Sequence, residues 1–237
     1  FRIVTADPAR LIIFYQAIGF AVDEAAPIPA AYMKLLGLSG SGSRIAMSLG
    51  PSRVDLETYS RPGRPYPRDT AACDLVFQHL ALVTDDARAA WRRACDAGAK
   101  PISREGPVTL PQSEGGVTAV KFCDPEGHPL EFLQFPPGSN SHWTGTGILG
   151  IDLSAISVGD LGASRRFYTR HGLREAGATV NRGPTQEALD GLDGVAVDVV
   201  SMRPMDAPPH VELLGYRHPF GRALRLVVFE SLAERAV

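Results

Sequence analysis

One stretch of the sequence reads Phe122-Cys123-Asp124-Pro125-Glu126-Gly127-His128-Pro129-Leu130-Glu131 and describes a hairpin whose second strand carries a single acid. Asp-Pro-Glu-Gly is strong turn chemistry, because proline presets φ and glycine accepts positive φ. Apolar residues surround Glu131 on both sides. The stretch therefore predicts two antiparallel strands, over 117–123 and 128–135, with a carboxylate among apolar neighbours.

This acid-bearing strand closes a longer pattern that occurs three times. Each copy has an apolar strand, an aspartate, a short amphipathic helix that ends at glycine, and later a strand with one acid. The helix aspartates and closing acids are Asp7 with Asp55, Asp86 with Glu131, and Asp160 with Glu212. A period of roughly 75–80 residues is longer than a solenoid repeat of about 20–50 residues, so it indicates a duplicated α+β unit.

The helices are predicted over 7–17, 86–97 and 160–171. Each begins with an aspartate suited to the N-cap and ends before a glycine. Strands are predicted before them, over 2–5, 76–84 and 151–158. Helical spacing predicts that several residues face the core, among them Trp91, Cys95, Phe167 and Tyr168.

Two stretches, 60–69 and 136–141, have the Pro-rich and Ser-rich composition of linkers. The second is the predicted domain boundary. A first module then spans 1–137, with units at 1–67 and 74–137, and a second module spans 143–237. Only a strand over 224–229 and the start of a helix over 231–237 are recognisable of a fourth unit, so the second module is expected to be incomplete. The chain also begins inside a predicted strand without methionine, so residues before Phe1 are expected to be missing.

Composition limits the classes of function. Of 237 residues, 44% are hydrophobic and 21% are charged, as in soluble globular proteins. A net charge of −2 with scattered Lys and Arg argues against binding nucleic acid or an anionic membrane. No apolar stretch approaches the roughly 18 residues that span a bilayer. The widely spaced Cys73, Cys95 and Cys123 form no CxxC pair, which argues against a thiolate zinc site and favours the reducing cytoplasm.

Strand alternation selects the candidate site residues. Glu131 shares its strand face with Leu133, and His79 shares its face with Ala81. A carboxylate on such a face is costly unless it is paired, protonated or bound to a cation. Each residue alone is more commonly a satisfied polar group. If the outer strands of a unit converge, however, His79 and Glu131 meet, and Asp55 is the equivalent acid of unit one. His, Asp and Glu form the ligand set of a catalytic divalent metal with an open position.

The chain resembles the vicinal oxygen chelate superfamily, which includes glyoxalase I, extradiol dioxygenases, methylmalonyl-CoA epimerase and the bleomycin- and fosfomycin-resistance proteins. The resemblance rests on the 78–83 strand leading to Asp86, on the 122–131 stretch, and on the Phe-Tyr helices at 13–20 and 164–168. It implies an α+β fold of tandem paired βαβββ units. Their curled mixed sheets would surround a cavity, with helices on the outer face and metal ligands on the first and last strands of each unit.

Carried over to this sequence, the resemblance implies that His79 and Glu131 are metal ligands and that Asp55 is a third ligand or the general base. Asp55 departs from the glutamate more common in the family. Leu153 stands where unit three would carry a histidine, so Glu212 is more typical of a pocket acid than of a ligand. The second module is therefore expected to be metal-free, which disfavours the extradiol subgroup, since its members usually keep iron there.

Two functions stay open on the sequence alone. The first is a metal-dependent enzyme, an isomerase or lyase or else a dioxygenase, acting on a small substrate with vicinal oxygens. Its site would lie in the first module and hold one divalent transition metal, Fe, Ni, Zn or Mn. The alternative is a metal-free, drug-sequestering binding protein. A cytoplasmic monomer or homodimer is expected, and neither the substrate nor the metal can be identified.

Overall fold

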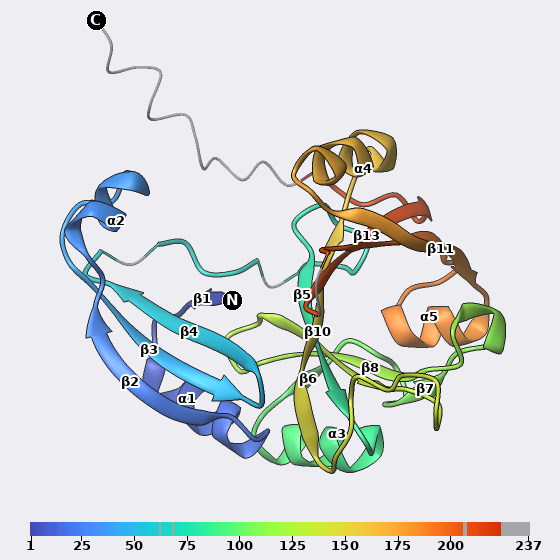
Figure 1. Ribbon diagram of the computed structural model, residues 1–237, viewed down its shortest axis with the longest axis horizontal. Coiled ribbons are helices and arrows are strands. Elements are labelled where there is room, and N and C mark those ends of the chain that lie inside the picture. The colour runs from blue at the N-terminus through green and yellow to red at the C-terminus, as the bar shows by residue number, and fades with distance from the viewer. Residues whose placement is uncertain (62, 68, 206–207, 224–237) are drawn as a thin grey trace, which may run out of the picture.

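The computed structural model describes residues 1–61, 63–67, 69–205 and 208–223. The predicted strand at 224–229 and helix at 231–237 lie outside the described residues. Three α+β units follow one another along the chain (Figure 1).

Unit one contains β1 (Arg2–Val4), α1 (Pro8–Ala17), β2 (Ala21–Pro27), α2 (Ala30–Leu35), β3 (Gly42–Leu49) and β4 (Ser52–Tyr59). Unit two contains β5 (Gln78–Thr84), α3 (Ala87–Asp96), β6 (Lys100–Pro101), β7 (Val108–Thr109), the 3-10 helix η1 (Gln112–Glu114), β8 (Thr118–Cys123) and β9 (Pro129–Gln134). Unit three contains β10 (Ile148–Ser157), α4 (Leu161–Arg170), β11 (Arg174–Arg182), α5 (Pro184–Asp190), β12 (Ala196–Arg203) and β13 (His210–His218).

The three predicted helix starts are confirmed. The side chains of Asp7, Asp86 and Asp160 accept hydrogen bonds from backbone N–H groups three residues later, at 3.1, 2.9 and 2.8 Å. These bonds satisfy donors that the first helical turn leaves without partners. None of the helices that the structure describes has the length and apolar character needed to cross a bilayer.

The inward faces of two helices differ from the prediction. Cys95 is exposed, because the buried stripe of α3 consists of Ala87, Ala90 and Ala94. These small side chains let the helix lie close to its sheet. Phe167 of α4 is 54% exposed, whereas Tyr168 packs partly against Val200, Met202 and Leu213, because the two adjacent residues point in different directions around the helix.

The strands form two sheets. Unit one has a four-stranded sheet in the order β1-β4-β3-β2. Units two and three together form a nine-stranded sheet in the order β11-β12-β13-β10-β5-β9-β8-β6, with β7 beside β8. In every unit the first strand lies parallel to the last, as in β1 with β4, β5 with β9, and β10 with β13. The outer strands of each unit therefore converge.

The nine-stranded sheet exists because β5 and β10 pair antiparallel, from Thr84 opposite Ile148 to Gln78 opposite Ile156. Backbone pairing thus joins unit two to unit three, whereas unit one keeps its own sheet (Figure 1). Both partners are first strands with a free edge, and the 136–147 connection lets the chain return along β5. Units one and two share a core, and the modules 1–137 and 143–237 stay a prediction.

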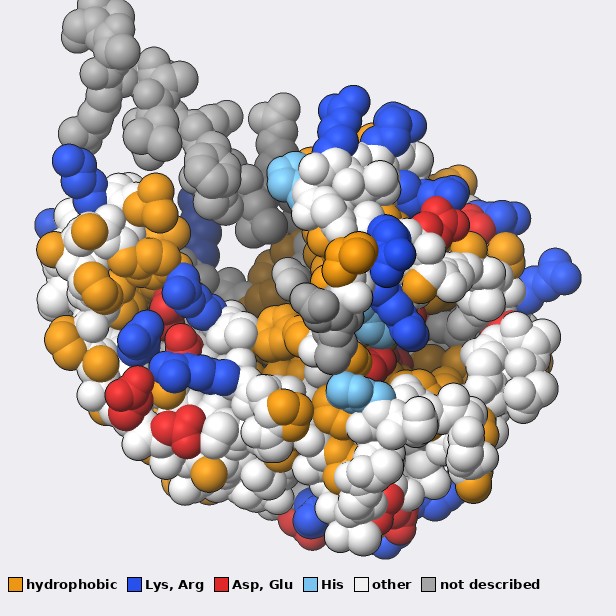
Figure 2. All heavy atoms as spheres, in the orientation of Figure 1, with side chains coloured by type: hydrophobic (Ala, Val, Ile, Leu, Met, Phe, Trp, Pro, Cys, Tyr) orange, Lys and Arg blue, Asp and Glu red, His pale blue; other side chains and the backbone are white. Residues whose placement is uncertain are grey.

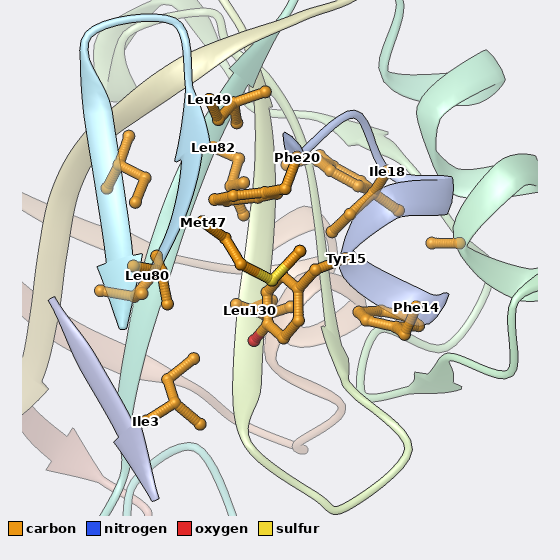
Figure 3. Close-up of a cluster of buried hydrophobic side chains, with 14 of the residues drawn as sticks. Ile3, Phe14, Tyr15, Ile18, Phe20, Met47, Leu49, Leu80, Leu82 and Leu130 are labelled. Carbon is orange, nitrogen blue, oxygen red and sulfur yellow. The ribbon is translucent and has the colours of Figure 1, made fainter. Parts of the chain in front are cut away.

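Alternation along β5, β8 and β9 sends successive side chains to opposite faces of this sheet. Leu82, Phe122 and Leu130 lie on one face, in the core shared with unit one. In Figure 3, Phe14, Tyr15 and other side chains of unit one gather around Leu80, Leu82 and Leu130. The opposite face borders a hollow, which is visible over the nine-stranded sheet in Figure 2.

The predicted turn before β9 is built around Asp124, which is fully buried. One of its oxygens accepts the backbone N–H groups of Glu126, Gly127 and His128 at 2.9, 2.9 and 3.0 Å. The other oxygen lies 2.8 Å from the Nδ1 atom of His128, so this histidine stabilises the turn. The Tyr15 hydroxyl also donates to it, at 3.4 Å.

Glu126, in the same turn of unit two, forms hydrogen bonds with unit one. Its Oε1 atom accepts from the Thr5 hydroxyl at 2.8 Å and from the Asp7 backbone N–H at 2.9 Å. The turn therefore holds both its own hairpin and the start of α1.

We predict that Asp124→Ala lowers the free energy of unfolding by about 2–4 kcal/mol, because it leaves several partly buried donors and the buried Tyr15 hydroxyl without an acceptor. Urea unfolding followed by circular dichroism measures this change. The matched control is Asp96→Ala, at an exposed aspartate of α3, with an expected change within about 0.5 kcal/mol. Equal stability of the two variants would contradict the prediction.

Candidate functional site

A cavity of about 380 Å³ lies on the face of the nine-stranded sheet that points away from unit one. In Figure 2, acidic and histidine side chains are visible in the hollow. Units two and three both supply its wall. The polar and ionisable residues that line it are His79, Glu114, Lys121, Glu131, Asp152, Thr179, Asn181, Gln186, Ser201, Arg203, His210, Glu212 and Tyr216.

His79 and Glu131 meet in this cavity. The His79 Nε2 atom lies 3.1 Å from the Glu131 Oε2 atom, and their side chains are 2% and 7% exposed. The convergence of the outer strands of unit two, β5 and β9, brings them together, as expected from the sequence. Burial lowers the pKa of His79, although the neighbouring Glu131 charge acts in the other direction. The imidazole is therefore neutral at neutral pH, and its buried Nδ1 atom has no hydrogen-bond partner among the described residues.

The strand registers reveal a local two-fold relation between units two and three. Glu131 lies opposite Ala81 of the first strand of its unit, and Glu212 lies opposite Ala155 of the first strand of unit three. Across the central pair, Ala81 faces Leu153 and Ala155 faces His79. Glu212 is therefore the counterpart of Glu131, and Leu153 is the counterpart of His79. The cavity has two equivalent acids, but only one of the two equivalent first-strand positions carries a histidine.

Glu212 is a pocket acid, as the sequence suggested. Burial raises its pKa to about 7, and the Glu131 charge acts in the same direction. Its side chain keeps some accessible surface because it borders the cavity, but protein surrounds it. Near neutral pH the carboxyl group therefore exists in both the protonated and the ionised form, as proton transfer requires.

Sequence reasoning missed a buried ion pair in the same cavity. The Nζ atom of Lys121, on β8, lies 2.6 Å from Asp190 at the end of α5. The other Asp190 oxygen accepts from Gln186 at 2.8 Å and from the Tyr216 hydroxyl at 2.9 Å. Burial alone would lower the pKa of Lys121, but the negative charges of Asp190 and Glu131 outweigh it and raise this pKa. A lysine between buried apolar neighbours in a strand was the available signal.

A second pair lies at another part of the cavity wall. His210 Nδ1 is 3.7 Å from Asp152, and the Trp143 indole N–H donates to Asp152 at 2.8 Å. Burial lowers the pKa of His210, although Asp152 acts against this. The only other histidine that lines the described cavity is thus associated with Asp152 and not with Glu131.

The structure does not bring Asp55 to the His79–Glu131 pair. Asp55 lies on β4 of the four-stranded sheet and accepts from the Arg53 Nε atom at 2.9 Å. It is absent from the described cavity wall, because β4 pairs with β1 and β3 of its own unit. Of the three residues predicted for a first-module site, the structure brings together His79 and Glu131 but not Asp55, and unit three supplies much of the surrounding wall.

These residues are of the types that bind a transition metal, but there are too few of them to enclose an ion. A neutral imidazole and a carboxylate are in contact, and one buried imidazole nitrogen has no partner among the described residues. Within the described part of the chain, however, no three His, Cys, Asp or Glu side chains are close enough to hold one ion. Leu153 in place of a second histidine accounts for the missing donor.

Comparisons with known proteins agree with this architecture. The family model of the glyoxalase/bleomycin resistance protein/dioxygenase superfamily matches residues 1–132. A search of curated proteins finds no match. Glyoxalase I from Zea mays is similar in structure, with 17% identity, a TM-score of 0.60, and coverage of 94% of this chain and 67% of that one.

Two further solved structures share the fold. A point mutant of the maize enzyme has 17% identity and a TM-score of 0.61, with coverage of 94% of this chain and 68% of that one. A dioxygenase candidate from Bacillus subtilis has 14% identity and a TM-score of 0.57, with coverage of 93% of this chain and 63% of that one. At such identities the likeness establishes the fold.

We predict that Glu212→Gln makes the protein more stable than the wild type at pH 8 and not at pH 4. Because the folded state raises the pKa of Glu212 from 4.5 to about 7, its contribution to stability is present below pH 4.5 and is lost as the pH rises to 7. The gain at pH 8 is at most about 3 kcal/mol. Urea unfolding at both pH values measures it. Glu105→Gln, at an exposed glutamate, is the control, and an equal gain there would contradict the assignment.

Proposed function

Because the chain belongs to the glyoxalase/bleomycin resistance protein/dioxygenase superfamily, we propose that it is a metal-dependent enzyme of the isomerase or lyase type. Its substrate would be a small molecule with two vicinal oxygens, bound in the cavity between units two and three. The observation that carries the proposal is the contact of 3.1 Å between His79 and Glu131 at this cavity.

His79 and Glu131 would hold one divalent transition metal. When bound, such an ion supplies Lewis-acid polarisation of a substrate oxygen. With two protein donors, a bound ion would keep positions open for a substrate oxygen. Neutral imidazole is the form of histidine that binds metals, which agrees with the lowered pKa of His79.

Glu212 would be the general base. Its carboxylate takes a proton from the substrate carbon beside a carbonyl group, the C–H bond breaks, and its electron pair moves to the carbonyl oxygen. The hydroxyl proton of the substrate then moves to the former carbonyl oxygen, and return of the proton from Glu212 to the former carbonyl carbon completes the isomerisation. A base with a pKa of about 7 is well matched to this exchange at neutral pH.

The apolar part of the wall would exclude water and limit the substrate in size. It includes Leu110, Leu133, Leu189, Val197 and Leu214, and a cavity of about 380 Å³ suits a small molecule. The same apolar surroundings account for the raised pKa of Glu212. Three unpaired cysteines also agree with a cytoplasmic location.

Dioxygenase chemistry is the less favoured reaction type. Non-haem Fe(II) oxygenases use two histidines and one carboxylate as ligands. Here Leu153 occupies the symmetric position of His79, and His210 is associated with Asp152. The carboxylate base that proton transfer needs is already at the cavity, in Glu212.

The second candidate is a metal-free protein that binds a small molecule. One observation favours it: the ammonium group of Lys121 borders the same cavity as Glu131, where it provides a positive charge without a metal. Metal content separates the two candidates.

We predict about one transition metal per chain in protein purified without chelator, and loss of the metal in His79→Ala and Glu131→Ala. Elemental analysis of the purified variants measures it. His171→Ala, at the exposed histidine that follows α4, should keep the wild-type content. An absence of metal, together with no thermal shift on addition of Ni, Zn, Mn or Fe(II), would favour the binding protein.

We also predict that the enzyme catalyses exchange of the α-proton of a small α-hydroxycarbonyl compound with D₂O, followed by NMR across a panel of such compounds. Glu212→Gln should slow the exchange by about 10²–10⁴-fold, because the base is lost while the metal ligands stay. The wild-type rate should rise with pH through about 7, as Glu212 ionises. Exchange that persists in Glu212→Gln would assign the base to another residue.

A further inference from the structure

Lys121 is a buried cation on the cavity side of β8. It is 4% exposed, whereas the other two lysines of the chain, Lys34 and Lys100, are exposed. Its neighbours Val120 and Phe122 point into the core shared with unit one. Alternation therefore directs Lys121 to the opposite face, where it lines the cavity. A buried ammonium group is costly without partners, so its position requires an explanation.

Asp190 holds the ammonium group of Lys121 in place but accepts only one of its three N–H donors. One Asp190 oxygen accepts from Lys121, and the other is occupied by Gln186 and Tyr216. The carboxylate is thus fixed and in turn fixes the Nζ atom. An ammonium group has three donors, and among the described residues only Asp190 accepts one of those of Lys121.

The strand register places this cation beside the proposed centre. Lys121 lies directly opposite Glu131 in the β8–β9 pair, where cross-strand Cβ atoms are about 4.5–5.5 Å apart. The two-fold counterpart of Lys121 is Ser201, which lies opposite Glu212. The Ser201 hydroxyl is buried and has no hydrogen-bond partner among the described residues.

The two symmetric positions therefore differ in polarity. The position opposite Glu131 holds a fixed ammonium donor, and the position opposite Glu212 holds a neutral hydroxyl. A substrate with two adjacent oxygens would turn the oxygen that becomes negative toward the ammonium group. Its other oxygen would lie toward Ser201, and the C–H bond between them toward Glu212.

We propose that Lys121 binds the reacting oxygen of a small enolisable hydroxycarbonyl substrate, while the Ser201 hydroxyl binds the adjacent oxygen. This inference rests on the proposed proton-transfer function and names the residues that recognise its substrate. As Glu212 takes the proton, the C–H electron pair moves to the carbonyl oxygen, and Lys121 stabilises that oxygen by hydrogen bonding. Lys121 keeps all its protons. Its nitrogen then has no free electron pair, so no Schiff base forms.

The test uses acetohydroxamic acid, a small neutral compound with two adjacent oxygens, titrated calorimetrically into the full chain. We predict that Lys121→Met weakens its binding by about 10–100-fold, because a charge-assisted hydrogen bond is lost. Lys121→Arg should recover only part of this affinity, because the broader guanidinium group is shaped differently. Lys34→Met is the matched control, with unchanged affinity expected. Metal content should stay at the wild-type value in all three variants.

Lys121→Met also leaves Asp190 buried without its cation, which can prevent folding. The double variant Lys121→Met with Asp190→Asn removes both charges, and the same titration is then made on it. Wild-type affinity in a folded variant without Lys121 would overturn the inference and leave the lysine as a counter-ion of Asp190. Failure of acetohydroxamic acid to bind the wild type would overturn it as well.

Titration after chelator treatment separates this inference from the proposed function. If the wild type holds no metal but its affinity still depends on Lys121, the inference stands and the metal-dependent function fails. If the metal is present and bound through His79 and Glu131, but affinity is independent of Lys121, the function stands and the inference fails.

Discussion

The antiparallel pairing of β5 with β10 is the constraint on which the cavity depends. It places the first strands of units two and three side by side, and each of these strands carries its own closing strand on its outer edge. Glu131 and Glu212 consequently lie on one face, each opposite an alanine of a central strand. A slip of one residue in a strand would move its side chains to the other face, into the core shared with unit one.

The same alternation gives the two faces of the sheet different roles: one packs in the core and the other lines the cavity. Leu82, Phe122 and Leu130 stabilise the protein through the shared core, while His79, Lys121 and Glu131 on the neighbouring positions face the cavity. The low polarity of the surrounding protein affects each ionisable group according to its partner. His79 becomes neutral, Lys121 stays charged because Asp190 is in contact with it, and Glu212 titrates near neutrality.

Sequence differences between units two and three make the two sides of the cavity chemically unlike. Leu153 stands where unit two has His79, and Ser201 stands where unit two has Lys121, although both acids are kept. A duplicated framework thus carries His79 and Lys121 on one side of the cavity and Glu212, whose pKa is near 7, on the other. A small, asymmetric substrate is the kind of ligand that such an arrangement can orient.

The sequence by itself determined the elements whose causes are local. Aspartate caps started the three helices, the Asp124 turn formed the hairpin, and strand parity decided which neighbours share a strand face with His79 and with Glu131, because these features depend on neighbouring residues. Only the tertiary structure decided that unit two pairs with unit three, that Asp55 stays in the sheet of unit one, and that Lys121 meets Asp190, which is 69 residues away. Any free strand edge offers the same backbone donors and acceptors, so the choice of partner depends on how whole units pack and not on a local pattern.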